Sequence, residues 1–271
     1  MKHLIFGIIA TAIVAAMVLF ACNKSQVEDV EFSAMEEQAL INPANPDNPF
    51  DYYGDLHNKG LRIALDELKD SPDASFEERI RVSGQAAQKV LSEEGMAMSK
   101  STVNITDTAE FIAAMEFLID DMKNNYVNFI ESLNVDFYTK RQLQFFFHDI
   151  IAMSEIEGLT YNDVSNKIIE FEDKILNNII AIPSNEREVV LAGTSTMRYS
   201  LNFWAEEMDL IDPETGTLRR GGWKWWHYGI VVAADALGAM AGCGSVGGVV
   251  LFGVGYSGLA AAIINIALNM E

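Results

Sequence analysis

Apolar residues recur every three or four positions between residues 51 and 220, the spacing that places them on one face of an α-helix. Four such stripes stand out, with few polar interruptions. They are Phe111, Met115, Leu118, Met122, Tyr126, Phe129 and Leu133; Leu143, Phe147, Ile150 and Ser154; Val164, Ile168, Phe171, Ile175 and Ile179; and Val190, Thr194, Met197, Leu201, Trp204 and Met208. Strand-like alternation does not extend over a useful length. The pattern predicts an acidic all-α body, residues 51–220, built as a bundle of about five or six antiparallel helices.

Capping signals agree with this helical interpretation. Ser75-x-x-Glu78, Asp107-x-x-Glu110 and Thr139-x-x-Gln142 are capping boxes or close variants of them, which mark the first turns of helices. Gly158 and Pro183 lie where helices are expected to end.

Residues 22–50 have the composition of a tether. They begin polar and acidic and reach the stretch NPANPDNPF, residues 42–50, which holds half of the prolines of the chain. Proline lacks a backbone donor and biases the preceding residue toward extended geometry. We therefore expect a non-helical spacer between the N-terminus and the body.

The last segment, residues 221–271, differs from the rest of the chain because it is nearly uncharged. Asp235 is the only charged residue in 229–270, whereas the whole chain has a net charge of −20. The pattern predicts a hairpin of two helices, 226–241 and 249–268, with a break in the glycine-rich stretch between them. The same stretch contains GxGxxG patterns, but no strand precedes them and no acidic residue follows at the required distance, which argues against nucleotide binding.

Small residues four apart predict close helix packing in this hairpin. The positions are Ala234, Gly238, Gly242, Gly244 and Gly248. A hairpin that is apolar on all sides is typical either of a membrane segment or of the centre of a bundle. We favour membrane association of residues 225–268, because glycine fills little core volume, and keep burial in the bundle as the alternative. The hairpin resembles the glycine-zipper hairpins of some membrane-active peptides and toxins.

The N-terminus reads as a secretory signal, residues 1–21, with a basic Lys2 followed by an uncharged apolar run. Leu19, Phe20, Ala21 and Cys22 resemble the lipobox of bacterial lipoproteins, which implies that Cys22 becomes acylated and holds the protein to membrane lipid. The residue directly after Cys22 is not an aspartate, so we expect the protein to be located at the outer membrane of the cell envelope. The strongly acidic balance argues against a nucleic-acid partner, and the sequence does not identify a protein partner.

The stretch NPFDYYGDLHN, residues 48–58, is similar to a short motif of lipobox-bearing bacterial lipoproteins of Gram-negative bacteria. The matching residues are Asn48, Pro49, Phe50, Asp51, Tyr53, Gly54, His57 and Asn58. That family carries no established activity to transfer. We expect Asp51 to cap the first helix, Gly54 to allow close packing, and His57 and Asn58 to bind backbone groups.

No residue pattern predicts catalysis or a cofactor. His57, His148 and His227 lie far apart, without the spacing of a zinc protease or a di-iron bundle. A loop metal site of Asp51, Asp55 and His57 is the remaining metal alternative, and Ser257 lacks the second glycine of a hydrolase elbow.

Three classes of function remain open. The first is a non-enzymatic, lipid-anchored envelope protein whose hairpin associates with the membrane. The second is a membrane-active effector that forms pores or acts like a bacteriocin. The third is an α-helical binding module with the hairpin as its buried core.

Overall fold

The computed structural model describes residues 42–68, 74, 76–96, 126–153, 156, 159–207, 225–242 and 253–254. These residues are 79% helical, in seven helices, and contain no strand. The prediction of an all-α body is therefore confirmed for the described part of the chain. Residues 1–41, including the predicted signal segment and Cys22, lie outside it.

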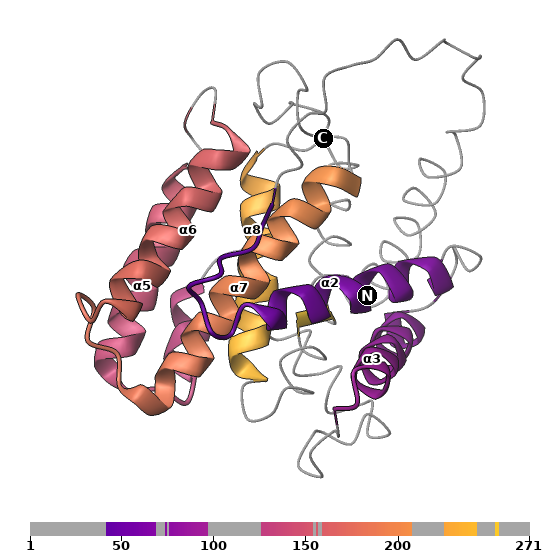
Figure 1. Cartoon of the computed structure of the whole chain (residues 1–271). Coiled ribbons are helices and arrows are strands. Elements are labelled where there is room, and N and C mark those ends of the chain that lie inside the picture. The colour runs from indigo at the N-terminus through magenta and orange to yellow at the C-terminus, as the bar shows by residue number, and fades with distance from the viewer. Residues whose placement is uncertain are drawn as a thin grey trace, which may run out of the picture.

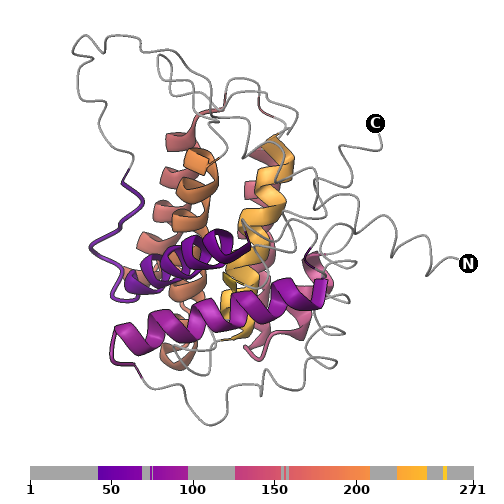
Figure 2. The same ribbon diagram turned by 90° about the vertical axis from the view of Figure 1, so that its right-hand side faces the viewer.

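Six helices carry labels in Figure 1. They are α2 (Tyr52–Leu68), α3 (Phe76–Glu93), α5 (Phe137–Met153), α6 (Tyr161–Leu176), α7 (Ser184–Glu207) and α8 (Trp225–Ala241). Residues 126–132 form a further helical stretch. The helices α7 and α8 occupy the middle, with α5 and α6 on one side and α2 and α3 on the other (Figures 1 and 2).

Local sequence signals explain several helix ends. Thr160 and Asp163 form a reciprocal capping box at the start of α6. The helix α3 ends in a Schellman motif, in which Gly95 has a φ of 68° and the Met96 N–H donates to the Leu91 carbonyl at 2.8 Å. The predicted capping box at Thr139 is wrong, because α5 begins earlier: the Asp136 carboxylate accepts a hydrogen bond from the Thr139 N–H at 2.7 Å.

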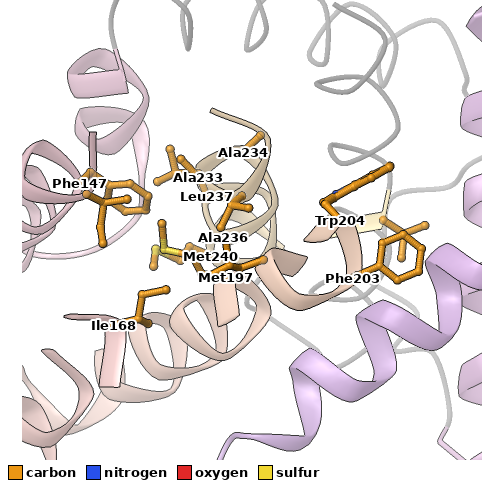
Figure 3. Packing of buried hydrophobic residues seen from close by; sticks show 14 of the residues in the cluster. Phe147, Ile168, Met197, Phe203, Trp204, Ala233, Ala234, Ala236, Leu237 and Met240 are labelled. Atoms are coloured by element: carbon orange, nitrogen blue, oxygen red, sulfur yellow. The ribbon is translucent and has the colours of Figure 1, made fainter. Parts of the chain in front are cut away.

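Where the structure describes them, the predicted apolar stripes lie in the core of the bundle, whereas Phe111, Met115, Leu118, Met122, Ser154 and Met208 lie outside the described residues. Leu143, Phe147 and Ile150 of α5 are buried, as are the corresponding positions of α6 and α7. In Figure 3 side chains of three helices converge on Leu237 and Met240 of α8. Ile179 departs from the prediction, because α6 ends at Leu176 and leaves this side chain 71% exposed in the following loop.

The helix α8 coincides with the first predicted helix of the hairpin and ends at the glycine-rich stretch. Residues 232–240 are all buried. The close approach of α7 is visible at Gly193, where a Cβ atom would lie 3.0 Å from the Ala236 carbonyl oxygen. Residues 232–240, within the first helix of the predicted hairpin, thus belong to the protein core. Among the described helices, none is both long and apolar enough to cross a bilayer.

Residues 42–50, the last part of the predicted tether, differ from the prediction, and we name them the Asn-Pro strap. The strap is non-helical, as expected, but it does not act as a spacer. Asn45 and Asn48 are only 4% and 3% exposed, and their side chains bond to the bundle. The strap therefore belongs to the body from Pro43 onward, because the Pro43 carbonyl and the buried amides of Asn45 and Asn48 bond to the helices.

Candidate functional site

Arg198, in the middle of α7, is completely buried and lies at the centre of a polar cluster. Its guanidinium Nε is 3.2 Å from Oε2 of Glu172 on α6, and its Nη2 is 3.2 Å from Oε1 of the same residue. Nη2 also pairs with the Asp51 carboxylate, and Nη1 donates to the carbonyl oxygen of Pro43. One side chain therefore joins α7 to α6, to the start of α2 and to the Asn-Pro strap.

Glu172 is as deeply buried as its partner, and two amides complete its hydrogen bonds. Asn45 Nδ2 donates to Oε2 at 2.7 Å, and Asn48 Nδ2 donates to Oε1 at 3.0 Å. Burial raises the pKa of Glu172 above its ordinary value, while the charge of Arg198 and the hydrogen bond from Asn45 oppose that rise. Donors thus surround both carboxylate oxygens, which is the condition for keeping a carboxylate inside a core.

The geometry of the strap follows from a three-residue repeat of Asn-Pro-x. In each copy the Asn Oδ1 accepts a hydrogen bond from the backbone N–H two residues later: Ala44 for Asn42, Asp47 for Asn45 and Phe50 for Asn48. The local turn occupies the amide oxygen and leaves the amide nitrogen available. In the second and third copies that nitrogen donates to Glu172. The repeat is the sequence signal that identifies the strap, and the composition of a tether obscures it.

Asp51 has a different role from the predicted helix cap. Its carboxylate accepts hydrogen bonds from the Tyr199 hydroxyl at 3.1 Å and from the Asn45 N–H at 3.2 Å, in addition to its pairing with Arg198. The backbone N–H of Gly54, at the third helical position, donates instead to the Asp51 carbonyl and to Ser195 Oγ, each at 3.2 Å. Burial, together with the Asp51 carboxylate, raises the pKa of Tyr199.

The expectation of close packing at Gly54 is confirmed. A Cβ atom at this position would lie 2.3 Å from Tyr199 Cδ2 and 2.7 Å from Ser195 Oγ. The absence of a side chain on α2 thus allows α7 to approach and brings Asp51 within reach of Arg198 and Tyr199.

His57 of α2 and Asp235 of α8 form a second buried polar site, which we name the His57 pair. Both side chains have no exposed surface, and Nε2 lies 3.8 Å from Oδ2. Ser200 of α7 donates a hydrogen bond to Asp235 Oδ2. The neighbouring Asn58 Nδ2 donates to the Tyr199 carbonyl at 2.8 Å, which is the kind of backbone contact expected for this residue. Burial lowers the pKa of His57 to about 4, so the imidazole is neutral at pH 7.

Ser200, Asp235 and His57 are the residue types of a hydrolase triad, but their order is different. In a triad the histidine lies between the serine and the carboxylate and takes the serine proton. Here the Ser200 hydroxyl donates to Asp235, and all three residues are fully buried. This arrangement suits a structural contact among α2, α7 and α8.

The three residues of the loop metal alternative do not converge. Asp51 is directed to Arg198, Asp55 pairs with Lys59 at 3.0 Å in a half-exposed position, and His57 lies inside the bundle. Within the described part of the chain, no group of three or more candidate metal ligands occurs.

The predicted helix-packing residues fall in two groups. Ala234 and Gly238 are buried within α8, and Gly242 is partly exposed just after its end. Gly244 and Gly248, like the predicted lipidation site Cys22, lie outside the described residues. The contact of Gly193 is with Ala236 and Met240, on a different face of α8 from Ala234 and Gly238. The predicted contact between the two halves of the hairpin stays a prediction.

Sequence reasoning missed Glu172 and Arg198. Arg198 directly follows Met197, a position of the apolar stripe. An arginine there, with no acidic residue near it in the sequence, was the available signal.

Comparison with family models, with curated proteins and with solved structures found no match.

Proposed function

We propose that the chain is a lipid-anchored, non-enzymatic protein of the bacterial cell envelope, attached through Cys22, whose helical body acts by binding. The lipobox at residues 19–22 supports the anchor. The buried cluster around Arg198 supports the non-catalytic part of the proposal. Its charged groups pair with one another, and neither Arg198 nor Glu172 has any exposed surface from which to contact a substrate.

The observation that carries the proposal is the attachment of the Asn-Pro strap. The strap directly follows residues 22–41, the segment that would lead from the lipid, and it bonds to Arg198 and Glu172 in the centre of the bundle. A pull on the anchor would therefore act on the core of the body and not on an exposed loop. Such an attachment suits a protein that holds a folded domain at a membrane surface.

Of the alternatives for the hairpin, we propose burial in the bundle for its first half. The lone charged residue of this segment, Asp235, has Ser200 and His57 as partners inside the protein. In a bilayer a charged side chain at mid-depth costs at least about 2.5 kcal/mol, so partners of this kind favour the protein interior. Membrane association of the second half, residues 249–268, stays a prediction.

The anchor is tested by mass spectrometry of the mature protein from a Gram-negative host. We expect a diacylglyceryl group on an N-terminal Cys22 and recovery of the protein in the membrane fraction, whereas Cys22→Ser should move the protein to the soluble fraction. An unmodified N-terminus, or cleavage at another position, would contradict the anchor.

The place of the hairpin is tested by deleting residues 225–271 from the Cys22→Ser form. We expect the truncated body to lose cooperative unfolding by circular dichroism, because α8 supplies part of the core. The full-length Cys22→Ser form, purified without detergent, is the matched control. A truncated body that stays folded, beside a full-length protein that needs detergent, would support the membrane-active class instead.

A further inference from the structure

The helix α5 exposes large side chains on the face that points away from the bundle. Phe137 is 74% exposed, Phe145 is 57% exposed and Tyr138 is 45% exposed, whereas Leu143 and Phe147 on the opposite face are buried. Single exposed apolar residues are common on protein surfaces, but several on one helical face mark an interaction site. The helix lies at the outer side of the bundle, away from α2 and α3 (Figure 1).

Four residues of this face follow one another at intervals of four and form what we name the α5 ladder: Phe137, Arg141, Phe145 and Asp149. Arg141 is exposed, and its guanidinium carbon lies 5.1 Å from the centroid of the Phe145 ring. The Asp149 side chain is 52% exposed and pairs with Lys167 of α6 at 2.9 Å. Residues four apart form a ridge along one face of a helix, so these four side chains are presented together to a second helix.

The order of side chains in the ladder is complementary to itself. A two-fold axis through Phe145, with two copies of α5 antiparallel, places each residue opposite the one equally far from Phe145 on the other copy. Arg141 then faces Asp149, twice in the pair, and Phe145 faces Phe145. The outer Phe137 and Tyr138 face the C-terminal turn of the other α5, where the exposed Ala152 leaves room for an aromatic ring.

We infer that the α5 ladder is the contact surface for a second copy of this chain, in an antiparallel pair centred on Phe145. Opposite charges on either side of the central ring select this partner over a lipid surface, because Asp149 would face anionic headgroups there. The inference does not depend on the anchor at Cys22.

One helical face is smaller than the roughly 800 Å² that each partner contributes to a standard interface, so we expect a weak dimer. Anchoring would strengthen such a weak contact, since confinement of both copies to one membrane raises their effective concentration.

The first experiment measures self-association of the Cys22→Ser protein by sedimentation equilibrium up to about 100 μM, a range that detects weak dimers. We expect a monomer–dimer equilibrium that Phe145→Ser weakens by about tenfold or more, because it removes the central aromatic contact. The matched control is Ile179→Ser, which removes an exposed apolar side chain from a loop off the ladder. A monomer at all concentrations, or a dimer insensitive to Phe145→Ser, would overturn the inference.

Charge exchange identifies the partner residues. Arg141→Asp and Asp149→Arg should each weaken the dimer, and the double variant Arg141→Asp with Asp149→Arg should restore it, since the pair then reforms with reversed signs. A merely local effect on the Phe145 or Lys167 contacts would not be rescued in this way. Failure of the double variant to recover would overturn the antiparallel register.

Cysteine cross-linking tests the position of the two-fold axis. It uses the full-length Cys22→Ser protein with Cys243→Ser added, so that the introduced cysteine is the single thiol of the chain. Phe145→Cys should form an intermolecular disulfide, because a residue on a two-fold axis meets itself, whereas Phe137→Cys should not. Cross-linking through Phe137→Cys alone would exclude this axis. Binding of vesicles that depends on Phe145, by a protein that stays monomeric, would assign the surface to lipid and overturn the inference.

Discussion

Arg198 and Glu172 face each other in the centre of the bundle, with Nε 3.2 Å from Oε2 and neither side chain exposed. The pair joins the two helices α6 and α7, and the strap residues Asn45 and Asn48 bond to the same carboxylate. Loss of one member leaves a buried charge without its counter-ion, which is more damaging than loss of an exposed ion pair.

We predict that Arg198→Met lowers the free energy of unfolding by about 3–5 kcal/mol, since Glu172 and Asp51 would both lose their cation. Urea denaturation followed by circular dichroism measures this change. The exposed pair of Lys174 and Glu170, 2.7 Å apart, is the control, and Glu170→Gln should leave the free energy of unfolding nearly unchanged because solvent screens this pair. In the double variant Arg198→Met with Glu172→Met the loss should be smaller than the sum of the single losses, and additive losses would show that the two side chains are not coupled.

The strap offers a comparison within its own repeat. We predict that Asn48→Ala destabilises the fold by about 1–3 kcal/mol, because Glu172 and the Leu191 carbonyl would each lose a buried donor. Asn42→Ala removes the same side chain from the first copy, where Asn42 is exposed and its side-chain oxygen accepts a local hydrogen bond from the Ala44 N–H. Its effect should stay within about 0.5 kcal/mol in thermal or urea unfolding. Equal effects of the two variants would mean that the buried bonds of the strap contribute nothing.

Gly54→Ala should force α2 and α7 apart. The added methyl group would lie 2.3 Å from the ring of Tyr199, whose hydroxyl donates a hydrogen bond to Asp51. Overpacking of this kind typically costs about 1–3 kcal/mol, against a small gain in helix propensity. The exposed Asp66 on the same helix provides the control substitution Asp66→Ala. A Gly54→Ala protein with an unchanged or raised melting temperature would be incompatible with the described contact.

His57 predicts a specific dependence of stability on pH. Its pKa is about 4 in the folded protein, against an ordinary value of 6.5, so between these values the unfolded chain binds more protons than the native one. The stabilisation is therefore fully present above pH 6.5 and is lost as the pH falls toward 4, by about 3 kcal/mol in all. Urea unfolding at pH 7 and pH 4.5 should show a larger loss for the wild type than for His57→Gln. Equal losses of unfolding free energy in the two proteins would contradict a buried, neutral His57. The carboxylates of the chain are the same in both proteins, so the difference between them isolates the histidine.

The helices and their buried faces could be predicted from the sequence. The stripes of α5, α6 and α7 are core positions, and α8 begins within one residue of its predicted start, because apolar periodicity and helix-breaking glycines act over only a few residues. The start of α5 and the place of Ile179 were predicted incorrectly. At Ile179 the periodic pattern extends past the end of α6, and at Thr139 a capping-box pattern lies inside α5, so only the capping bonds of the folded chain decide where these helices end or begin.

Of the polar sites, the sequence by itself marked Gly54, His57 and Asn58, since they belong to a short motif with unusual residue types. It left Glu172 and Arg198 unmarked, although each is essential to the arrangement of the other. The strap and Glu172 are separated by more than 120 residues, and no local pattern specifies a hydrogen bond across such a distance.

The chain alone therefore determined that the protein is helical, which faces of its helices are apolar and where its uncharged segment begins. Only the tertiary structure decided that the Asn-Pro strap belongs to the body and that α8 lies between the other helices. The physical reason is the same in both cases. A proline-rich stretch has the same local preferences in a spacer and in a packed strap, and a helix that is apolar on every side excludes water equally well in lipid and in a protein core. What separates these outcomes is the position of a few polar partners, Arg198 and Glu172 for the strap and Ser200 for Asp235, which the fold brings together from distant parts of the sequence.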